Sequence, residues 1–415
     1  MGQRLAALVL VLLLVQYAIE TGLLLLNLRH AARARGVPGP LAGRVDDDTA
    51  ARSREYTLAN GRFSLVTGAW GLALAVATLY SGVLPWLDAA LARAGLSEAN
   101  RFVAFLGALS AAFTMADLPF SAWHTFAVEA RFGFNRTPWR LWIVDRLKGF
   151  GLAAALGLPF LYGVYAFMRF TGSFWWIWLF GFVTAYQIVL LWLWPSVIAP
   201  LFNRFQPLPE GELRARLEAL ARDAGFRNRG LYVMDASRRS GHSNAYFAGL
   251  LRPRIVLFDT LVTQMTIDEA ASVLAHEIGH FRRRHVHRRL VLSLAGTLLV
   301  LFVLSLLVPW PPLYAAFGFD RPSLEAALAL ASLGGGGFVF WLAPVASVLS
   351  RRHEYEADRY SVRLAGHPDA LKSALVRLTG QNLSNLHPHP WYSAWHYSHP
   401  TLVERLAAID RVTSP

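Results

Sequence analysis

Long runs of apolar residues fill most of the chain and alternate with shorter polar segments that are rich in arginine. A helix needs about 20 apolar residues to cross a hydrocarbon layer of roughly 30 Å. The runs that are long enough predict seven transmembrane helices, over residues 5–28, 63–87, 102–123, 150–168, 174–198, 290–314 and 324–349. The first run is longer than the apolar part of a secretory signal, so we interpret it as a retained membrane anchor.

Positive charge is distributed unevenly between the connections of these predicted helices. Segment 29–62 contains seven Lys or Arg residues and segment 123–149 contains five, whereas the connections on the opposite side contain five in total. Loops rich in Lys and Arg stay on the cytoplasmic side of a membrane. We therefore expect both segments to be cytoplasmic, together with segment 199–289 and the C-terminal tail, and the N-terminus to lie outside.

The segment between the fifth and sixth predicted spans has the pattern of a small α+β domain. Its spacing predicts an amphipathic helix and two short strands, over residues 213–224, 231–234 and 254–258. Thr266 and Asp268, followed by Glu269, are typical capping residues for a helix that runs from about residue 267 past Arg284.

The fold class that follows is mainly α: a polytopic membrane protein with seven transmembrane helices and a small α+β domain. We divide the chain into the first five membrane helices, the first half of the small domain, a transmembrane hairpin and the second half of that domain, at 1–200, 201–289, 290–350 and 351–415. Glu20 and Asp117 lie within predicted spans, where carboxylates usually face a bundle interior or a wet cavity. For Glu20, the alternative is a position at the membrane interface near the end of a span. For Asp117, this interfacial position and a position facing the interior or a cavity are equally expected.

Composition excludes several classes of protein. The chain has 54% hydrophobic and 16% charged residues, against about 25% charged in soluble domains, which argues against an ordinary soluble enzyme. It contains no cysteine, which excludes disulfides, thiol catalysis and Cys-ligated zinc. The net charge of +13 reports topology and contact with anionic lipid headgroups in a membrane protein, so we expect no nucleic-acid partner.

The predicted capped helix contains His276, Glu277 and His280 in the pattern H-E-x-x-H. Residues four apart lie on one face of a helix, so both imidazoles can bind one cation, and Glu277 can reach a water beside it. Zinc suits this set, because it takes two imidazoles and a carboxylate and keeps one position open for water. Zinc lowers the pKa of that water, and Glu277 would take its proton as the water attacks a carbonyl.

A third ligand can come from Glu354 or Asp358, which lie four apart on a predicted helix after the last span. One of these carboxylates can bind the metal while the other orients a ligand histidine. A third histidine ligand of the metzincin type is excluded, because Arg283 and Val286 stand where that pattern needs Gly and His. We interpret His285 and His287, which lie among arginines before a span, as an interfacial anchor.

Six short segments occur in a characteristic order, at residues 132–136 (FGFNR), 200–203 (PLFN), 243–247 (SNAYF), 276–280 (HEIGH), 354–358 (EYEAD) and 398–400 (SHP). With seven spans, they resemble the integral-membrane zinc metallopeptidases of the CAAX prenyl protease 1 type, which are gluzincins. The resemblance covers nearly the whole chain. It implies that His276, His280 and Glu354 bind zinc, that Glu277 is the catalytic base and that Asp358 orients a ligand histidine.

The same resemblance assigns further residues. Asn244 and Ala245 match an edge strand that pairs with an extended substrate backbone. His399 and Arg405 match positions near the cleft and would stabilise the charged tetrahedral intermediate, whereas spacing alone makes His399 a turn residue. The resemblance also implies a barrel of seven helices around an intramembrane chamber.

We therefore predict a zinc endopeptidase that cleaves membrane-associated or lipidated polypeptides, with the bilayer and a peptide or prenylated protein as partners. The alternatives are a general quality-control peptidase of membrane proteins, a catalytically silent scaffold, and a transporter with an accidental motif. The arginine-rich, lysine-poor composition is typical of a high-GC bacterial genome. It places the chain in a bacterial inner membrane, with the zinc domain and the C-terminus cytoplasmic.

Overall fold

The computed structural model describes residues 1–226, 230–248 and 254–413. Its helices in the first half of the chain are α1 Gly2–Arg33, α2 Asp47–Tyr80, α3 Val83–Arg93, α4 Glu98–Trp123, α5 Trp139–Phe170, α6 Trp175–Leu193, α7 Ala199–Phe202 and α8 Glu212–Asp223. The later helices are α9 Asp259–Gln264, α10 Ile267–Arg282, α11 His285–Leu307, α12 Pro311–Ala315, α13 Leu324–Gly334, α14 Gly336–Val339, α15 Ala343–Ala365, α16 Pro368–Gln381, α17 Pro390–His396 and α18 Leu402–Thr413. The strands are β1 Phe205–Pro207, β2 Leu231–Met234, β3 Ala245–Ala248 and β4 Arg254–Phe258.

The long helices form the membrane part predicted from hydropathy. Six helices are long and apolar enough to cross a membrane, and α13 with α14–α15 makes a seventh span if the pair, bent by 44°, is counted as one. The run of four glycines at 334–337 explains the bend, because glycine is a poor helix former. The seventh span is therefore a broken helix, where we expected a continuous one.

Two other span ends differ from the prediction. The second span ends at Tyr80, not at residue 87, because Gly82 has a φ of 80° and α3 begins after it. The sixth span ends at Leu307, and Pro311 and Pro312 begin the separate short helix α12. Proline favours the first turn of a new helix because it has no backbone N–H to leave unpaired there.

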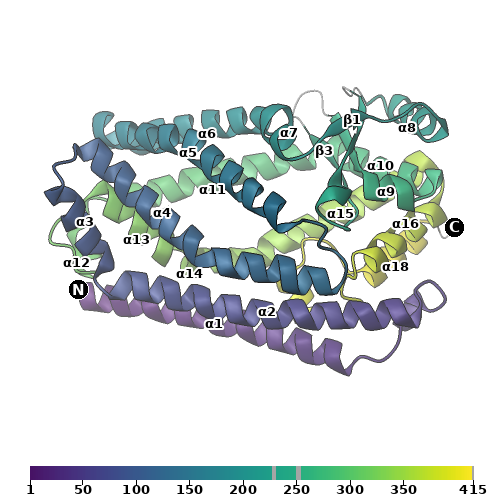
Figure 1. Ribbon diagram of the computed structural model, residues 1–415, viewed down its shortest axis with the longest axis horizontal. Helices are drawn as coiled ribbons and strands as arrows, with labels where there is room; N and C mark the ends of the chain where they lie inside the picture. Colours follow the sequence, from purple (N-terminus) through teal and green to yellow (C-terminus); the bar gives the residue numbers. More distant parts are fainter. Residues whose placement is uncertain (227–229, 249–253, 414–415) are drawn as a thin grey trace.

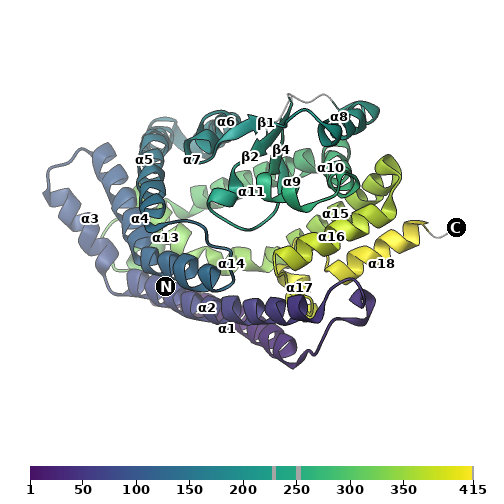
Figure 2. The same cartoon turned by 45° about the vertical axis from the view of Figure 1, so that its right-hand side comes forward.

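The long helices run along the molecule, and the small domain lies at one end (Figure 1). Figure 2 shows the same separation, with α3 at the end far from the sheet and from α8, α16 and α18. The connection from α1 to α2 and the connection from α4 to α5 both lie at the end of the small domain. The arginine-rich segments 29–62 and 123–149 therefore share one side with that domain, as the charge count predicts.

The small domain is built on a four-stranded sheet of order β1-β2-β4-β3, in which β2 and β4 are parallel and the other pairs are antiparallel. The predicted strands β2 and β4 and the amphipathic helix α8 are confirmed. Buried side chains of α8, β4 and α10 form the core beneath the sheet, namely Leu217, Leu220, Ile255, Leu257, Leu274 and Ile278. The prediction that α10 runs past Arg284 is wrong, because Arg284 adopts a φ of 58° and α11 starts at His285.

The two intramembrane carboxylates occupy polar surroundings. Glu20 Oε1 accepts a hydrogen bond of 3.0 Å from Gln16, one helical turn away on α1. Asp117 lines a pocket of about 410 Å³ between α4 and α5, together with Asp145 and Arg146. Asp117 thus has the cavity-facing position that was one of the two expectations.

Candidate metal centre

The helix α10 begins with the capping arrangement that its sequence predicts. Thr266 N donates to Glu269 Oε2 over 2.8 Å, and Glu269 N donates to Thr266 Oγ1 over 3.3 Å. Arg377 of α16 donates to both carboxylate oxygens of Glu269, and Ser373 donates to Oε1. These contacts fix the first turn of α10 and therefore the direction of the side chains that follow along it.

Gly279 is the point at which α10 crosses α15. A Cβ at this position would lie 3.1 Å from the Cα of Ala357 and 3.1 Å from the Cβ of Tyr360. The backbones can approach this closely because glycine has no side chain. Ala357 lies one turn after Glu354, so the crossing determines how near Glu354 comes to the histidines of α10.

Replacing Gly279 with valine should separate the two helices. The obstacle is the backbone of Ala357, which cannot turn away as a flexible side chain could, so we expect a loss of about 1–3 kcal/mol in the free energy of unfolding. Zinc affinity should fall as well, because Glu354 moves with α15. Thermal unfolding and chelator competition measure the two effects. The matched control is Gly296→Val in α11, where no atom beyond the backbone of the same helix lies within 4 Å of the added Cβ and little change is expected.

Three side chains from α10 and α15 converge at this crossing. His276 Nε2 lies 3.1 Å from His280 Nε2, and Glu354 oxygens lie 3.4 Å from the former and 3.3 Å from the latter. Ligands of a tetrahedral zinc at 2.0–2.1 Å stand about 3.3 Å apart. The two Glu354 contacts use different oxygens, Oε2 towards His276 and Oε1 towards His280. One donor atom from each residue lies within 4.8 Å of the other two, so these side chains form a group, within the described residues, that could hold a metal ion.

His276 is oriented by a carboxylate and a guanidinium behind it. Its Nδ1 lies 2.8 Å from Asp358 Oδ1, so Nε2 is left to face His280 and Glu354. Arg405 of α18 donates to both oxygens of Asp358, over 2.8 and 2.6 Å, and its Nη2 lies 3.4 Å from His276 Nδ1. In this structure Arg405 holds Asp358, and its expected role on a reaction intermediate stays a prediction.

The electrostatic field at the centre favours a cation. Burial alone would lower the pKa of His276, but the hydrogen bonds to Asp358 and Glu354 outweigh it and raise the pKa to about 9. The same negative carboxylates would attract a metal cation, which takes the place of the proton on the imidazole. The charge of the site and the spacing of its donors thus agree.

The interpretation of His285 as an interfacial anchor is wrong. Its side chain is 1% exposed, and its Nδ1 lies 3.0 Å from Nδ1 of His280. The left-handed conformation of Arg284 breaks the helix and turns His285 inwards, which helical spacing could not indicate. His287 is exposed, as expected of that interpretation.

A pocket of about 380 Å³ opens on the donor set. Glu277 and His399 line it together with the three donors, and its apolar walls are Leu191, Tyr246, Phe247, Phe281 and Val286. Burial raises the pKa of the Glu277 carboxyl above its ordinary value, which suits a proton acceptor at neutral pH. His399 Nδ1 lies 2.8 Å from Glu354 Oε2, so the residue after Ser398 belongs to the site and not to a remote turn.

The strand β3 forms the edge of the sheet beside this pocket. It pairs with β4 on one side, with Ala245 opposite Leu257, and among the described residues no strand pairs with its other side. Asn244, just before the strand, is exposed, and its carbonyl accepts a hydrogen bond of 3.0 Å from Phe258 N. An edge strand next to a metal centre can accept an extended peptide as an additional strand.

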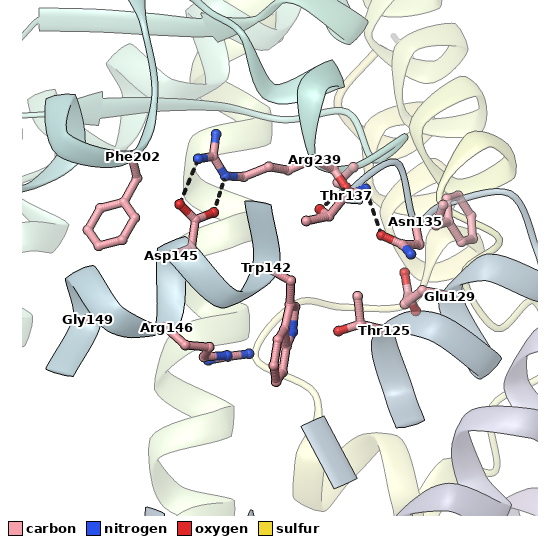
Figure 3. A pocket seen from close by; sticks show the side chains of 12 residues that line it. Thr125, Glu129, Asn135, Thr137, Trp142, Asp145, Arg146, Gly149, Phe202 and Arg239 are labelled. Atoms are coloured by element: carbon pink, nitrogen blue, oxygen red, sulfur yellow. Dashed lines mark hydrogen bonds and ion pairs between the residues drawn. The ribbon is translucent and has the colours of Figure 1, made fainter. Parts of the chain in front are cut away.

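Contacts with the membrane helices hold the loop that leads into β3. Arg239 makes a two-pronged ion pair with Asp145 of α5, at 2.8 and 3.1 Å, beside a pocket of about 530 Å³ (Figure 3). His242 lies 3.1 Å from Glu129 Oε2 and stacks on Phe134 at 4.0 Å. The sequence assigns no role to segment 132–136. In the structure this segment braces the loop, because its backbone hydrogen-bonds to Arg239 and Gly241, and Phe134 stacks on His242.

Two family models together match most of the chain. The model described as "CAAX prenyl protease N-terminal, five membrane helices" matches residues 27–204, and that of "Peptidase family M48" matches residues 207–413. The first of these matches and the spans described above establish that the chain is an integral membrane protein.

Similar proteins occur in eukaryotes. The CAAX prenyl protease 1 homolog of Oryza sativa subsp. japonica is 37% identical, over 98% of this chain and 97% of the relative. The CAAX prenyl protease 1 of Saccharomyces cerevisiae is also 37% identical, over 91% and 89%, and the Homo sapiens homolog is 30% identical, over 90% and 88%. The crystal structure of S. mikatae Ste24p superimposes with a TM-score of 0.91 at 33% identity, over 98% of this chain and 99% of that one.

Proposed function

The chain belongs to peptidase family M48 and is a zinc metallopeptidase of the CAAX prenyl protease 1 type, and on this basis we propose which residues carry the reaction and what they act on. His276, His280 and Glu354 would hold one zinc ion per chain. The observation that carries this assignment is the convergence of these three side chains beside Glu277, with one donor atom from each within 4.8 Å of the other two.

Zinc in this position would supply Lewis-acid activation of a water and of the peptide carbonyl. Glu277 would accept the proton of the attacking water and later donate it to the leaving amine, for which its raised pKa is suited. His399, which lines the same pocket, would donate a hydrogen bond to the oxygen on which negative charge develops. Arg405 would contribute through Asp358, by keeping His276 in place.

The substrate backbone would add to the sheet along the free side of β3. Asn244 and Ala245 stand at the start of that strand, so a peptide paired there would lead directly past Glu277. Tyr246 and Phe247 line the pocket and offer apolar contact to its side chains. A bound strand of this kind holds the scissile bond by backbone hydrogen bonds and leaves sequence preference to the pocket walls.

We propose that the natural substrates are prenylated proteins at the cytoplasmic face, because the relatives compared above are named CAAX prenyl proteases. The arginine-rich connections lie at the same end as the metal centre, which supports a cytoplasmic active site. The relatives come from eukaryotes, so they give no support to the bacterial inner membrane expected from composition. The intramembrane chamber likewise remains a prediction.

A farnesylated CAAX peptide and its unmodified twin separate the two peptidase functions. If the site processes prenylated proteins, kcat/KM should be at least tenfold higher for the farnesylated peptide, because the lipid adds binding energy in the bilayer. Equal kcat/KM for the two would favour general turnover of membrane proteins instead. The kcat/KM values of both peptides are measured with purified protein in lipid nanodiscs. A farnesylated peptide with a scrambled C-terminal sequence is the control for lipid partitioning alone.

A further inference from the structure

The second ring nitrogen of His280 faces another imidazole. His280 Nδ1 lies 3.0 Å from His285 Nδ1, and His285 Nε2 lies 3.0 Å from Glu356 Oε2. Three side chains from α10, α11 and α15 thus form one continuous hydrogen-bonded row that ends at the donor set. The other ligand histidine, His276, has Asp358 in the corresponding place.

The order of donors along this row follows from the carboxylate at its end. An ionised carboxylate only accepts hydrogen bonds, so His285 must carry its proton on Nε2 and donate it to Glu356. A neutral His285 then has a bare Nδ1, which accepts from His280. His280 therefore carries its proton on Nδ1 and presents the lone pair of Nε2 towards His276 and Glu354, as a metal ligand requires.

We propose that His285 and Glu356 are a positioning pair that sets the tautomer and the ring orientation of His280 for metal binding. The inference rests on the proposed function, in which His280 is a zinc ligand. It gives each ligand histidine its own support, Asp358 for His276 and the His285–Glu356 pair for His280. His285 lines the edge of the pocket, but neither His285 nor Glu356 is one of the three metal donors, so both act through His280.

Packing holds this row in one geometry. His285 is buried and stacks on His353 of α15, with ring centroids 4.1 Å apart and an angle of 13° between the planes. Arg284 places His285 there through its left-handed conformation. Arg288 lies 3.7 Å from Glu356 and keeps the carboxylate on the same side of α11. Because His285 and Glu356 are held in this way, they can select one orientation of the His280 ring, which a mobile, solvated partner could not do.

The test compares zinc affinities by chelator competition, and zinc release rates, in variants of the full-length protein. His285→Phe keeps the ring stack but removes the acceptor, and we expect zinc affinity to fall by about 10- to 100-fold. Glu356→Leu should have a similar effect, whereas Glu356→Gln should stay near the wild type, because its amide oxygen still accepts from His285 Nε2. His353→Phe is the matched control, since it keeps the stack and leaves the row intact.

Unchanged zinc affinity in His285→Phe would overturn the proposal. Equal losses in Glu356→Gln and Glu356→Leu would also overturn it, because they would show an effect of charge and not of the accepting oxygen. If His285→Phe does not fold, the Glu356 pair decides, since Glu356 lies near the surface of the domain. Zinc binding by the wild-type protein distinguishes a failure of this inference from a failure of the proposed function. If the wild-type protein binds no zinc, the assignment of the metal ligands has failed.

Discussion

Replacing Glu277 with alanine should leave the protein loaded with zinc and almost unable to hydrolyse peptides. The three donors do not include Glu277, so the metal site keeps its ligands. The proton acceptor is lost, and general base catalysis contributes about 10²- to 10⁴-fold to such reactions. We expect kcat/KM to fall by that factor at constant zinc content, measured by metal analysis and by peptide cleavage on the same preparation.

The control for this variant is Asp268→Ala, an exposed carboxylate on the same helix that is not among the residues lining the pocket. It should retain both zinc and activity. Wild-type cleavage by Glu277→Ala would show that another residue, or a contaminating peptidase, performs the reaction. Loss of zinc together with activity would contradict the assignment in a different way, because it would make Glu277 part of the ligand set.

Much of the fold could be predicted because its signals are local. Hydropathy identifies the spans, since a lipid-facing helix must be apolar along about 20 residues. Runs of β-branched and aromatic residues predicted β2 and β4 at their observed bounds, and Thr266 and Glu269 marked the start of α10. Each of these features depends on neighbours within a few positions of the chain.

The span and helix ends that were predicted wrongly depend on backbone geometry and tertiary contact. Gly82 and Arg284 adopt positive φ angles, which separate α2 from α3 and α10 from α11. The bend before α15 arises in a glycine run that packs against α1, where a Cβ at Gly337 would lie 3.0 Å from Leu12. Apolar periodicity carries no information about such breaks.

The sequence predicts the candidate donors of the metal site more completely than it predicts the residues that hold those donors in place. His276, Glu277 and His280 were predicted from their spacing on one helix. Glu354 was one of two candidates by spacing, and the resemblance to a family selected it. His285 was missed because a helix break separates it from His280, so no periodic spacing relates the two residues. Its neighbours in sequence are arginines, which made a surface position the natural interpretation.

Replacing Glu354 with alanine should remove the metal. Its carboxylate is 1% exposed and lies 3.3 to 3.4 Å from Nε2 of both histidines, so its removal leaves only two of the three candidate donors. We expect zinc content to fall from one ion per chain to nearly none after dialysis against a weak chelator, and hydrolysis to disappear with it. A bound ion at 1,000 times its Kd stabilises the folded state by about 4 kcal/mol, so zinc should raise the melting temperature of the wild type only.

Glu354→Gln separates the charge from the packing, because the amide has nearly the same size and can offer only a neutral oxygen. Its zinc affinity should lie between those of the wild type and Glu354→Ala, and its melting temperature without zinc should match the wild type more closely. If Glu354→Ala kept one zinc ion at wild-type affinity, the third ligand would have to come from elsewhere, and His399, 2.8 Å from the same carboxylate, would be the first residue to replace. The convergence of two helices at Gly279 would then be a structural contact and not the basis of the metal site.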